Sequence, residues 1–238
     1  MHHMNIHFVG TGGAFDYDFG NAAALVEFQG QHILVDCGPS IYSELCRTGY
    51  AALVDGILIT HLHGDHVGSL FTLILHLNRR LTPARKAVIL CPSAAFRDHL
   101  KEFLAFSLLD PLKYVDFISL QNTPWIGSID TTNRHECGLS SFAYYFTDGD
   151  ELIYFSGDIA SADVCAAFLE TRCEAKITVF HDVHYERVPT HVYYHDLAQQ
   201  LAGRDVYGYH VDPRRMPPES AIPLVAEHPE FLLRSRNS

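Results

Sequence analysis

Three histidines and one aspartate lie within six consecutive residues, directly after the apolar run 56–59. They are His61, His63, Asp65 and His66. Imidazole nitrogens and carboxylate oxygens both bind a divalent cation, at about 2.0–2.2 Å. Burying such groups without partners would be costly, and no lysine or arginine stands in the run to neutralise Asp65. The spacing therefore predicts a centre for two adjacent metal ions, which indicates a dinuclear metallohydrolase.

The predicted elements place this run at the end of a strand. Short apolar runs separated by turn residues predict strands at 5–9, 22–28, 32–36, 56–60, 87–90, 115–120, 139–146, 151–156, 176–181 and 204–209. Helical patterns stand at 39–47, 66–80, 93–106, 160–170, 194–202 and 217–227. Between two of the strands, Gly149 can take the positive φ that a hairpin needs, so we expect a hairpin there.

The order of these elements indicates the fold class. Early strands follow one another as hairpins, whereas later strands alternate with helices. This order favours the α/β (α+β) class and, within it, two facing sheets with helices on the outside, a four-layer αββα sandwich. The length of 238 residues suits a single domain spanning 1–238.

The charge balance argues against an extended nucleic-acid partner. The formal net charge is −11, and the basic residues form no long block that could neutralise many phosphates. Local basic pairs such as Arg79-Arg80 or Arg214-Arg215 could still meet a small anion, so a small phosphorylated substrate is open. The longest apolar stretch, near 70–77, is too short to span a bilayer, and no signal peptide precedes the first predicted strand. We therefore expect a cytoplasmic protein without a membrane partner.

Three stretches of the chain resemble a known family. The run 61–66 resembles the H-x-H-x-D-H signature of the metallo-β-lactamase superfamily. Residues 8–14 followed by 34–38 resemble the opening hairpins of its ribonuclease Z-like branch, and 156–158 resembles the motif of that branch's bridging aspartate. Together the stretches span most of the chain, and they imply a single metallo-β-lactamase-fold domain with metal-dependent hydrolase activity.

The resemblance also implies a ligand set. One ion would be held by His61, His63 and His135, the other by Asp65, His66 and His210, with Asp158 bridging both. His135, Asp158 and His210 each lie at or just beyond the C-terminal end of a predicted strand, where loops converge. His181 and His184 are rivals of His210, and Asp158 has a second interpretation as the N-cap of the helix predicted from 160. Zinc is the expected ion and manganese the alternative, because histidine and carboxylate ligands suit both.

Two residues are candidates for the chemistry. Asp65 would orient a metal-bridged hydroxide, and His191, which follows Pro189 and Thr190, would protonate the leaving oxygen as the general acid that the branch implies. The alternative for His191 is an outer-shell or helix-capping role.

The segment 136–157 leaves no room for the tRNA-grasping arm usually inserted there in ribonuclease Z. Arm-less relatives include cyclic nucleotide phosphodiesterases, so the expected function is a phosphodiesterase acting on a small phosphodiester such as a cyclic nucleotide. Phe142, Tyr185 and Tyr193 could stack on a base, or pack in the core. Relatives in this branch are commonly homodimers, and segment 100–112, rich in Phe and Leu, could be a contact surface or core.

Three alternatives from other classes stay open. The same ligands serve hydrolases of thioesters, lactones and other carbonyl substrates. Ribonuclease Z-type RNA processing is a further alternative, as is a non-hydrolytic redox or metal-sensing protein that uses iron.

Overall fold

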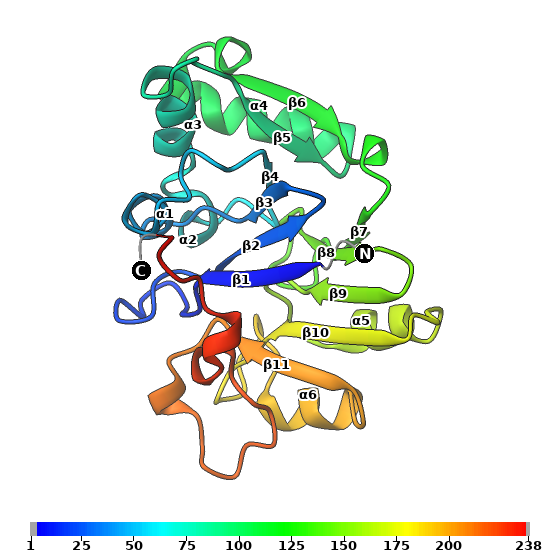
Figure 1. The fold of residues 1–238 in the computed structure, drawn as a ribbon. Helices are drawn as coiled ribbons and strands as arrows, with labels where there is room; N and C mark the ends of the chain where they lie inside the picture. The colour runs from blue at the N-terminus through cyan, green and yellow to red at the C-terminus, as the bar shows by residue number, and fades with distance from the viewer. Residues whose placement is uncertain (1–3, 237–238) are drawn as a thin grey trace.

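A six-stranded sheet forms the first half of the protein (Figure 1). The computed structural model describes residues 4–236. The strands of the first sheet lie in chain order: β1 (Asn5–Gly10), β2 (Ala23–Phe28), β3 (Gln31–Val35), β4 (Gly56–Leu58), β5 (Ala87–Cys91) and β6 (Val115–Ser119). β1 to β3 are antiparallel, and β3 to β6 are parallel. The parallel strands bring their carboxyl ends to one edge, where the run 61–66 begins.

A five-stranded sheet forms the second half. Its order is β11-β10-β9-β8-β7, from β7 (Ile126–Asp130), β8 (Phe142–Thr147), β9 (Glu151–Phe155), β10 (Lys176–Asp182) and β11 (Asp205–Tyr209). β7, β8 and β9 are antiparallel, whereas β9, β10 and β11 are parallel. The predicted hairpin is confirmed as β8 and β9, and Gly149 has the positive φ of 99°.

Alternate residues of β9 show how the layers are packed. Ile153 and Phe155 belong to the main core, which both sheets share with the helices α1 (Ile41–Thr48), α3 (Leu70–Arg79) and α4 (Ala94–Leu108). Leu152 and Tyr154 point the other way, into a second core with α5 (Asp163–Leu169) and α6 (Tyr194–Gln200). Because strand side chains alternate between faces, the second sheet is covered on both sides. The predicted four-layer αββα sandwich is confirmed.

Two predicted helices differ from the structure. The helix predicted at 66–80 is divided into α2 (Gly64–Val67) and α3, with Gly68 and Ser69 between them. The helix predicted at 217–227 is wrong, because only a 3-10 turn at Val225–Glu227 forms there. Pro223 has no backbone N–H to donate within a helix, and its carbonyl instead accepts a hydrogen bond from the Gly208 N–H.

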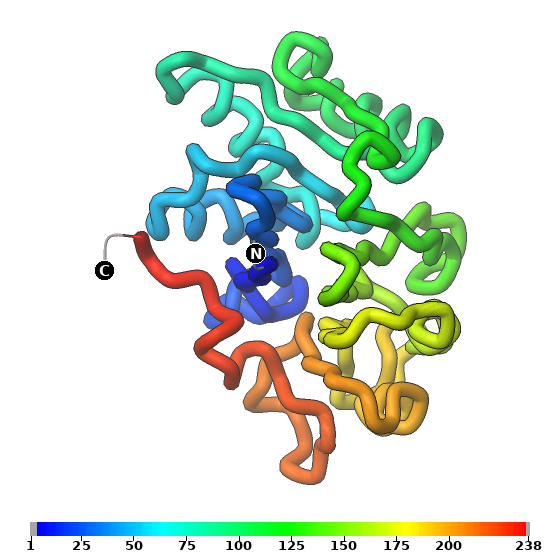
Figure 2. The backbone as a smooth tube through the Cα atoms, turned by 45° about the vertical axis from the view of Figure 1, so that its right-hand side comes forward, coloured from blue at the N-terminus to red at the C-terminus, as the bar shows by residue number. Residues whose placement is uncertain are grey.

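The segment 100–112 is both core and surface. Leu100, Leu104 and Leu108 are buried on one side of α4, whereas Phe106 and Leu109 are 91% and 90% exposed. No helix of residues 4–236 is long and apolar enough to cross a membrane. The C-terminal segment returns beside the first strand (Figure 2), where Leu232 forms a bridge with Phe8.

Candidate metal centre

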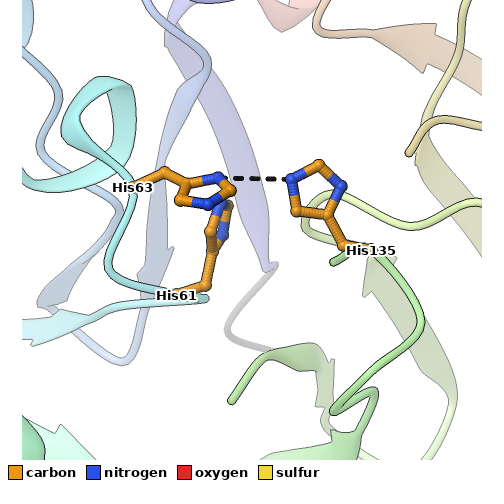
Figure 3. Close-up of side chains that lie close together, drawn as sticks. All are labelled: His61, His63 and His135. Carbon is orange, nitrogen blue, oxygen red and sulfur yellow. Dashed lines mark hydrogen bonds between the residues drawn. The ribbon is translucent and has the colours of Figure 1, made fainter. Parts of the chain in front are cut away.

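All seven predicted ligands meet where loops from the two sheets converge. The ligand atoms of His61, His63 and His135 lie within 4.8 Å of one another. Figure 3 shows His63 and His135 approaching from opposite sides, with His63 Nδ1 3.2 Å from His135 Nε2. A second set of ligand atoms is equally close, and it comes from Asp65, His66, Asp158 and His210. Their role as ligands stays a prediction, but the structure brings them together.

Outer partners fix which ring nitrogen of His61 and His66 faces the centre. Asp36 Oδ2 lies 2.8 Å from His66 Nδ1 and accepts a hydrogen bond from the Thr60 hydroxyl at 2.8 Å. Because the Thr60 hydroxyl donates to Asp36, its oxygen can accept from His61 Nδ1, which is 3.0 Å away. Within residues 4–236, the Nε2 atoms of His61 and His66 are buried and have no hydrogen-bond partner. Buried polar atoms are rarely unpaired, so this pair of nitrogens fits a metal centre.

The histidines from the other loops are held in the same way. His135 Nδ1 lies 2.7 Å from the Thr190 carbonyl, so its Nε2 is directed inward. His63 is reversed, since its Nε2 lies 3.0 Å from Glu136 Oε2 and its Nδ1 faces His135. His210 follows β11, and its backbone N–H donates to the Thr11 carbonyl of the other half at 2.7 Å. His135 and His63 therefore each have one ring nitrogen committed to their surroundings and one available to an ion.

Asp158 lies between the two sets of ligands. It is 3% exposed, and its Oδ2 is 3.3 Å from the Nε2 atoms of both His66 and His210 and 3.8 Å from His135 Nε2. Its Oδ1 has no hydrogen-bond partner among the described residues. The capping interpretation is wrong, because α5 begins at Asp163 and its N-cap is Ala162. Asp158 Oδ2 therefore lies close to ligand atoms of both sets.

The charges of the site shift the pKa values of the histidines in opposite directions. Burial, reinforced by the positive charge of His66, lowers the pKa of His61 well below its usual value. Burial would also lower the pKa of His66, but the carboxylates of Asp158 and Asp36 outweigh it and raise that pKa well above its usual value. Burial would raise the pKa of Asp158, and the charges of His210 and His66 hold it well below its usual range instead.

Asp36 and Asp182 are important residues that the sequence did not single out. Asp36 is fully buried and accepts hydrogen bonds from both the backbone N–H and the hydroxyl of Thr60. Asp182 ends β10, is fully buried and accepts from the Ile159 N–H at 3.0 Å. Both follow apolar strand residues, and a carboxylate in that position was the one signal available.

Asp182 holds His191 beside the centre. Its Oδ2 lies 2.8 Å from His191 Nδ1, and the His191 ring is 5.1 Å from that of His210 and 5.0 Å from that of His135. Burial would lower the pKa of His191, but the charge and hydrogen bond of Asp182 outweigh it and raise that pKa to about 9. His191 is therefore protonated at neutral pH and has Nε2 left to donate.

The two rivals of His210 lie outside both sets of ligands. His181 is fully buried with its Nδ1 2.7 Å from the Asp182 carbonyl, and burial lowers its pKa. His184 stacks on Tyr185, with ring centroids 4.3 Å apart.

A pocket opens from the centre to the surface. Its volume of about 410 Å³ lies within the range of small-molecule sites. The pocket is lined by residues of the centre that include His63, Asp65, Asp158, His191 and His210. Residues within 13–16, 135–136, 184–185 and 211–215 and Thr190 complete the lining. Of the three aromatic residues predicted as candidates for stacking, Tyr185 lines this pocket, whereas Phe142 packs against Phe96 in the core and Tyr193 lies under Arg187.

Comparison with known proteins gives the family. The family model of Anti-Pycsar protein Apyc1 matches residues 4–217. The chain belongs to the Apyc1 family. An Apyc1 protein of Bacillus phage BSP38 is 30% identical over 179 residues, 66% of this chain and 70% of that protein. The Apyc1 protein of Bacillus phage 010DV004 is 44% identical over 94 residues, 39% of this chain and 36% of the relative, and that of Bacillus phage vB_BsuM-Goe3 is 32% identical over 170 residues, 63% and 65%. The matched parts thus span from about a third to about two thirds of these two relatives.

Solved structures share the fold of this Apyc1 family member. YhfI of Bacillus subtilis, a metallo-β-lactamase fold protein, has a TM-score of 0.68 at 16% identity, over 87% of this chain and 86% of YhfI. Yeast PDE1 has a TM-score of 0.65 at 15% identity over 92% and 91%, and a diphosphatase from the PhnP family has 0.65 at 19% over 88% and 87%. The metallo-β-lactamase fold implied by the sequence resemblance is confirmed.

Proposed function

We propose that this chain is a metal-dependent phosphodiesterase that hydrolyses a small phosphodiester, such as a cyclic nucleotide, with two divalent ions. The observation that carries the proposal is the pair of ligand sets with Asp158 close to both, and with His191 held beside them by Asp182 at 2.8 Å. The names of relatives, Anti-Pycsar protein Apyc1, and the fold shared with yeast PDE1 and a diphosphatase support a phosphate substrate.

Different residues would act on the attacking water and on the leaving oxygen. Two divalent ions, when bound, supply an activated water molecule and neutralise charge on the phosphate. Asp65 lines the pocket with Oδ2 3.3 Å from His210 Nε2, and its carboxylate would orient the attacking water by accepting a hydrogen bond from it. The proton that the water loses would pass to solvent. His191 Nε2 would give its proton to the oxygen that leaves phosphorus, because Asp182 holds Nδ1. Water adds to phosphorus, the ester P–O bond breaks, and a phosphomonoester with a free hydroxyl remains.

The segment between His135 and Asp158 supports a small substrate. It contains a turn region and the β8–β9 hairpin, and no further helix or strand is inserted there. A long RNA would also meet a chain of net charge −11, which disfavours contacts along many phosphates.

The test is hydrolysis of cyclic AMP, GMP, CMP and UMP by protein supplied with zinc or manganese. We expect metal-dependent turnover that falls by orders of magnitude in Asp65→Ala, because this change removes the carboxylate that would orient the attacking water. Asp98→Ala is the matched control, since Asp98 is an exposed carboxylate on α4 paired with Arg97. Bis(p-nitrophenyl) phosphate and a p-nitrophenyl ester are run in parallel. Cleavage of the ester alone would refute the phosphodiesterase proposal and favour a carbonyl substrate.

A further inference from the structure

Two consecutive arginines at the rim of the pocket have different surroundings. Arg214 and Arg215 end a 3-10 turn that follows Asp212. Arg214 Nη2 lies 2.7 Å from Asp212 Oδ2, and its Nη1 lies 2.8 Å from Asp18 Oδ2. Because a 3-10 turn has three residues per turn, consecutive side chains point in different directions. Arg214 is therefore held outside by two carboxylates, and Arg215 is directed elsewhere.

Arg215 lies over an aromatic ring in the wall of the pocket. Its Cζ is 4.2 Å from the centroid of the Tyr185 ring. Both residues line the pocket that contains the metal centre. Arg215 forms no ion pair with a carboxylate anywhere in residues 4–236, unlike Arg214 or Arg187. Its planar group is thus oriented by Tyr185, and its N–H donors are not taken up by an acid.

The charge of the pocket makes this arginine distinctive. Asp16, Asp65, Glu136, Asp158 and Asp212 line the pocket, and Arg215 is the one lysine or arginine among the lining residues. Two of these acids, Asp65 and Asp158, would be neutralised by the ions, together with the reacting phosphate. In a bound nucleotide, the base would then extend toward the rim. There its carbonyl oxygens and ring nitrogens would meet the guanidinium of Arg215.

We propose that Arg215, placed over the Tyr185 ring, binds the nucleobase of the substrate through hydrogen bonds from its N–H groups to base acceptors. The inference rests on the proposed function, since it names the part of a cyclic nucleotide that is recognised away from the reacting phosphate. Arg215 is a specificity residue that touches substrate and takes no part in the bond changes at phosphorus.

The test compares one substrate that has a base with one that has none. Kinetic constants are measured for wild type, Arg215→Ala and Arg215→Lys on cyclic nucleotides and on bis(p-nitrophenyl) phosphate. We expect Arg215→Ala to raise KM for cyclic nucleotides about 10-fold or more with kcat nearly unchanged, because uniform binding is removed. Turnover of bis(p-nitrophenyl) phosphate should stay within about two-fold of wild type. Arg215→Lys keeps the charge but not the planar set of N–H donors, so it should recover only part of the loss.

Arg187→Ala provides a matched control. Arg187 also stacks on a tyrosine, with Cζ 4.5 Å from the Tyr193 ring, but it is paired with Asp196 and is not a lining residue of the pocket. It should leave both substrates unaffected. As a second measurement, the inhibition constant of nucleoside 5′-monophosphates should rise in Arg215→Ala while that of inorganic phosphate does not change.

The outcomes separate the two proposals. Equal losses on both substrates, or an unchanged KM for cyclic nucleotides, would refute base recognition by Arg215 and leave the phosphodiesterase proposal standing. A wild type that cleaves bis(p-nitrophenyl) phosphate but no cyclic nucleotide would refute the cyclic nucleotide substrate and the role of Arg215 together.

Discussion

Asp36 contacts His66 directly and His61 through Thr60, and we expect it to set the protonation of both rings, which Asp36→Asn tests. The carboxylate accepts three hydrogen bonds, from the Thr60 N–H, the Thr60 hydroxyl and His66 Nδ1, each at 2.8 Å. An asparagine amide has one oxygen and one NH₂ group, so at least one of these donors must face the NH₂ group, which is itself a donor. Asp36 has a positive φ of 64°, which asparagine tolerates well, so the backbone should stay in place.

If the amide oxygen keeps the hydrogen bond from the Thr60 N–H, the conflict is relieved by changing the histidine tautomers. If the amide NH₂ replaces Oδ2, His66 Nδ1 must become an acceptor, which moves its proton to Nε2. The Thr60 hydroxyl would then turn toward His61 Nδ1 and move the His61 proton to Nε2 as well. Both Nε2 atoms face the centre, and a protonated nitrogen cannot bind an ion. Loss of such outer partners typically weakens metal affinity 10–100-fold, about 1.4–2.7 kcal/mol for each ion.

The assay is a zinc titration against a competing chelator, with bound metal counted by mass spectrometry. We expect Asp36→Asn to bind both ions 10–100-fold more weakly than wild type. Asp116→Asn is the matched control, because Asp116 is an exposed strand residue whose carboxylate is 3.0 Å from Lys86 Nζ. Circular dichroism of the metal-free proteins checks that both variants are folded. A folded Asp36→Asn protein with wild-type affinity would show that the hydrogen bonds of Asp36 do not set the tautomers.

Three further predictions follow from the site and the surface. The pKa of His66 is raised well above its usual value and that of His61 is lowered, so in the metal-free protein at neutral pH His66 carries the extra proton and His61 does not. Binding of the ion that His66 would hold should therefore release a proton and weaken as pH falls. Calorimetry in buffers of different ionisation enthalpy measures this release. Asp182→Asn removes the charge that raises the pKa of His191 to about 9. Because a general acid must be protonated to act, the alkaline limb of the pH profile of kcat/KM should move to lower pH. An unmoved limb would exclude His191 as that acid. We also expect a homodimer in which the exposed Phe106 is buried, so Phe106→Ser should give monomers in sedimentation velocity, and a wild type that sediments as a monomer would contradict this.

The layered fold could be predicted because most strands are buried on at least one face and read as apolar runs. The sequence pattern does not predict β7, because the residues of this strand are set by packing against a distant side chain. A Cβ on Gly127 would lie 2.1 Å from Cζ of Tyr145, so the strand carries a glycine where the tyrosine ring crosses it. Glycine weakens the strand pattern, and the packing that requires it is invisible in a single segment.

The candidate ligands divide according to how local their signal is. The run 61–66 was evident from spacing, because four ligand residues fall in one turn after a strand. His135, Asp158 and His210 are single residues far apart in the chain, and the family resemblance was needed to select them. Neither the spacing nor the family resemblance selects Asp36 or Asp182 as a site residue. A lone acid at a strand end is common, and its importance depends on which histidine the fold brings to it.

The distribution of the ligands over both sheets has a consequence inside a cell. The run 61–66 follows the first sheet, whereas Asp158 and His210 follow strands of the second, so bound ions would tie the two halves together. A ligand that binds only the folded chain stabilises it by about 4 kcal/mol at a thousand times its dissociation constant. In a cell short of zinc or manganese, a larger fraction of the molecules would be unfolded and open to proteases. The amount of this protein, as well as its activity, would then rise and fall with the metal supply of the cell.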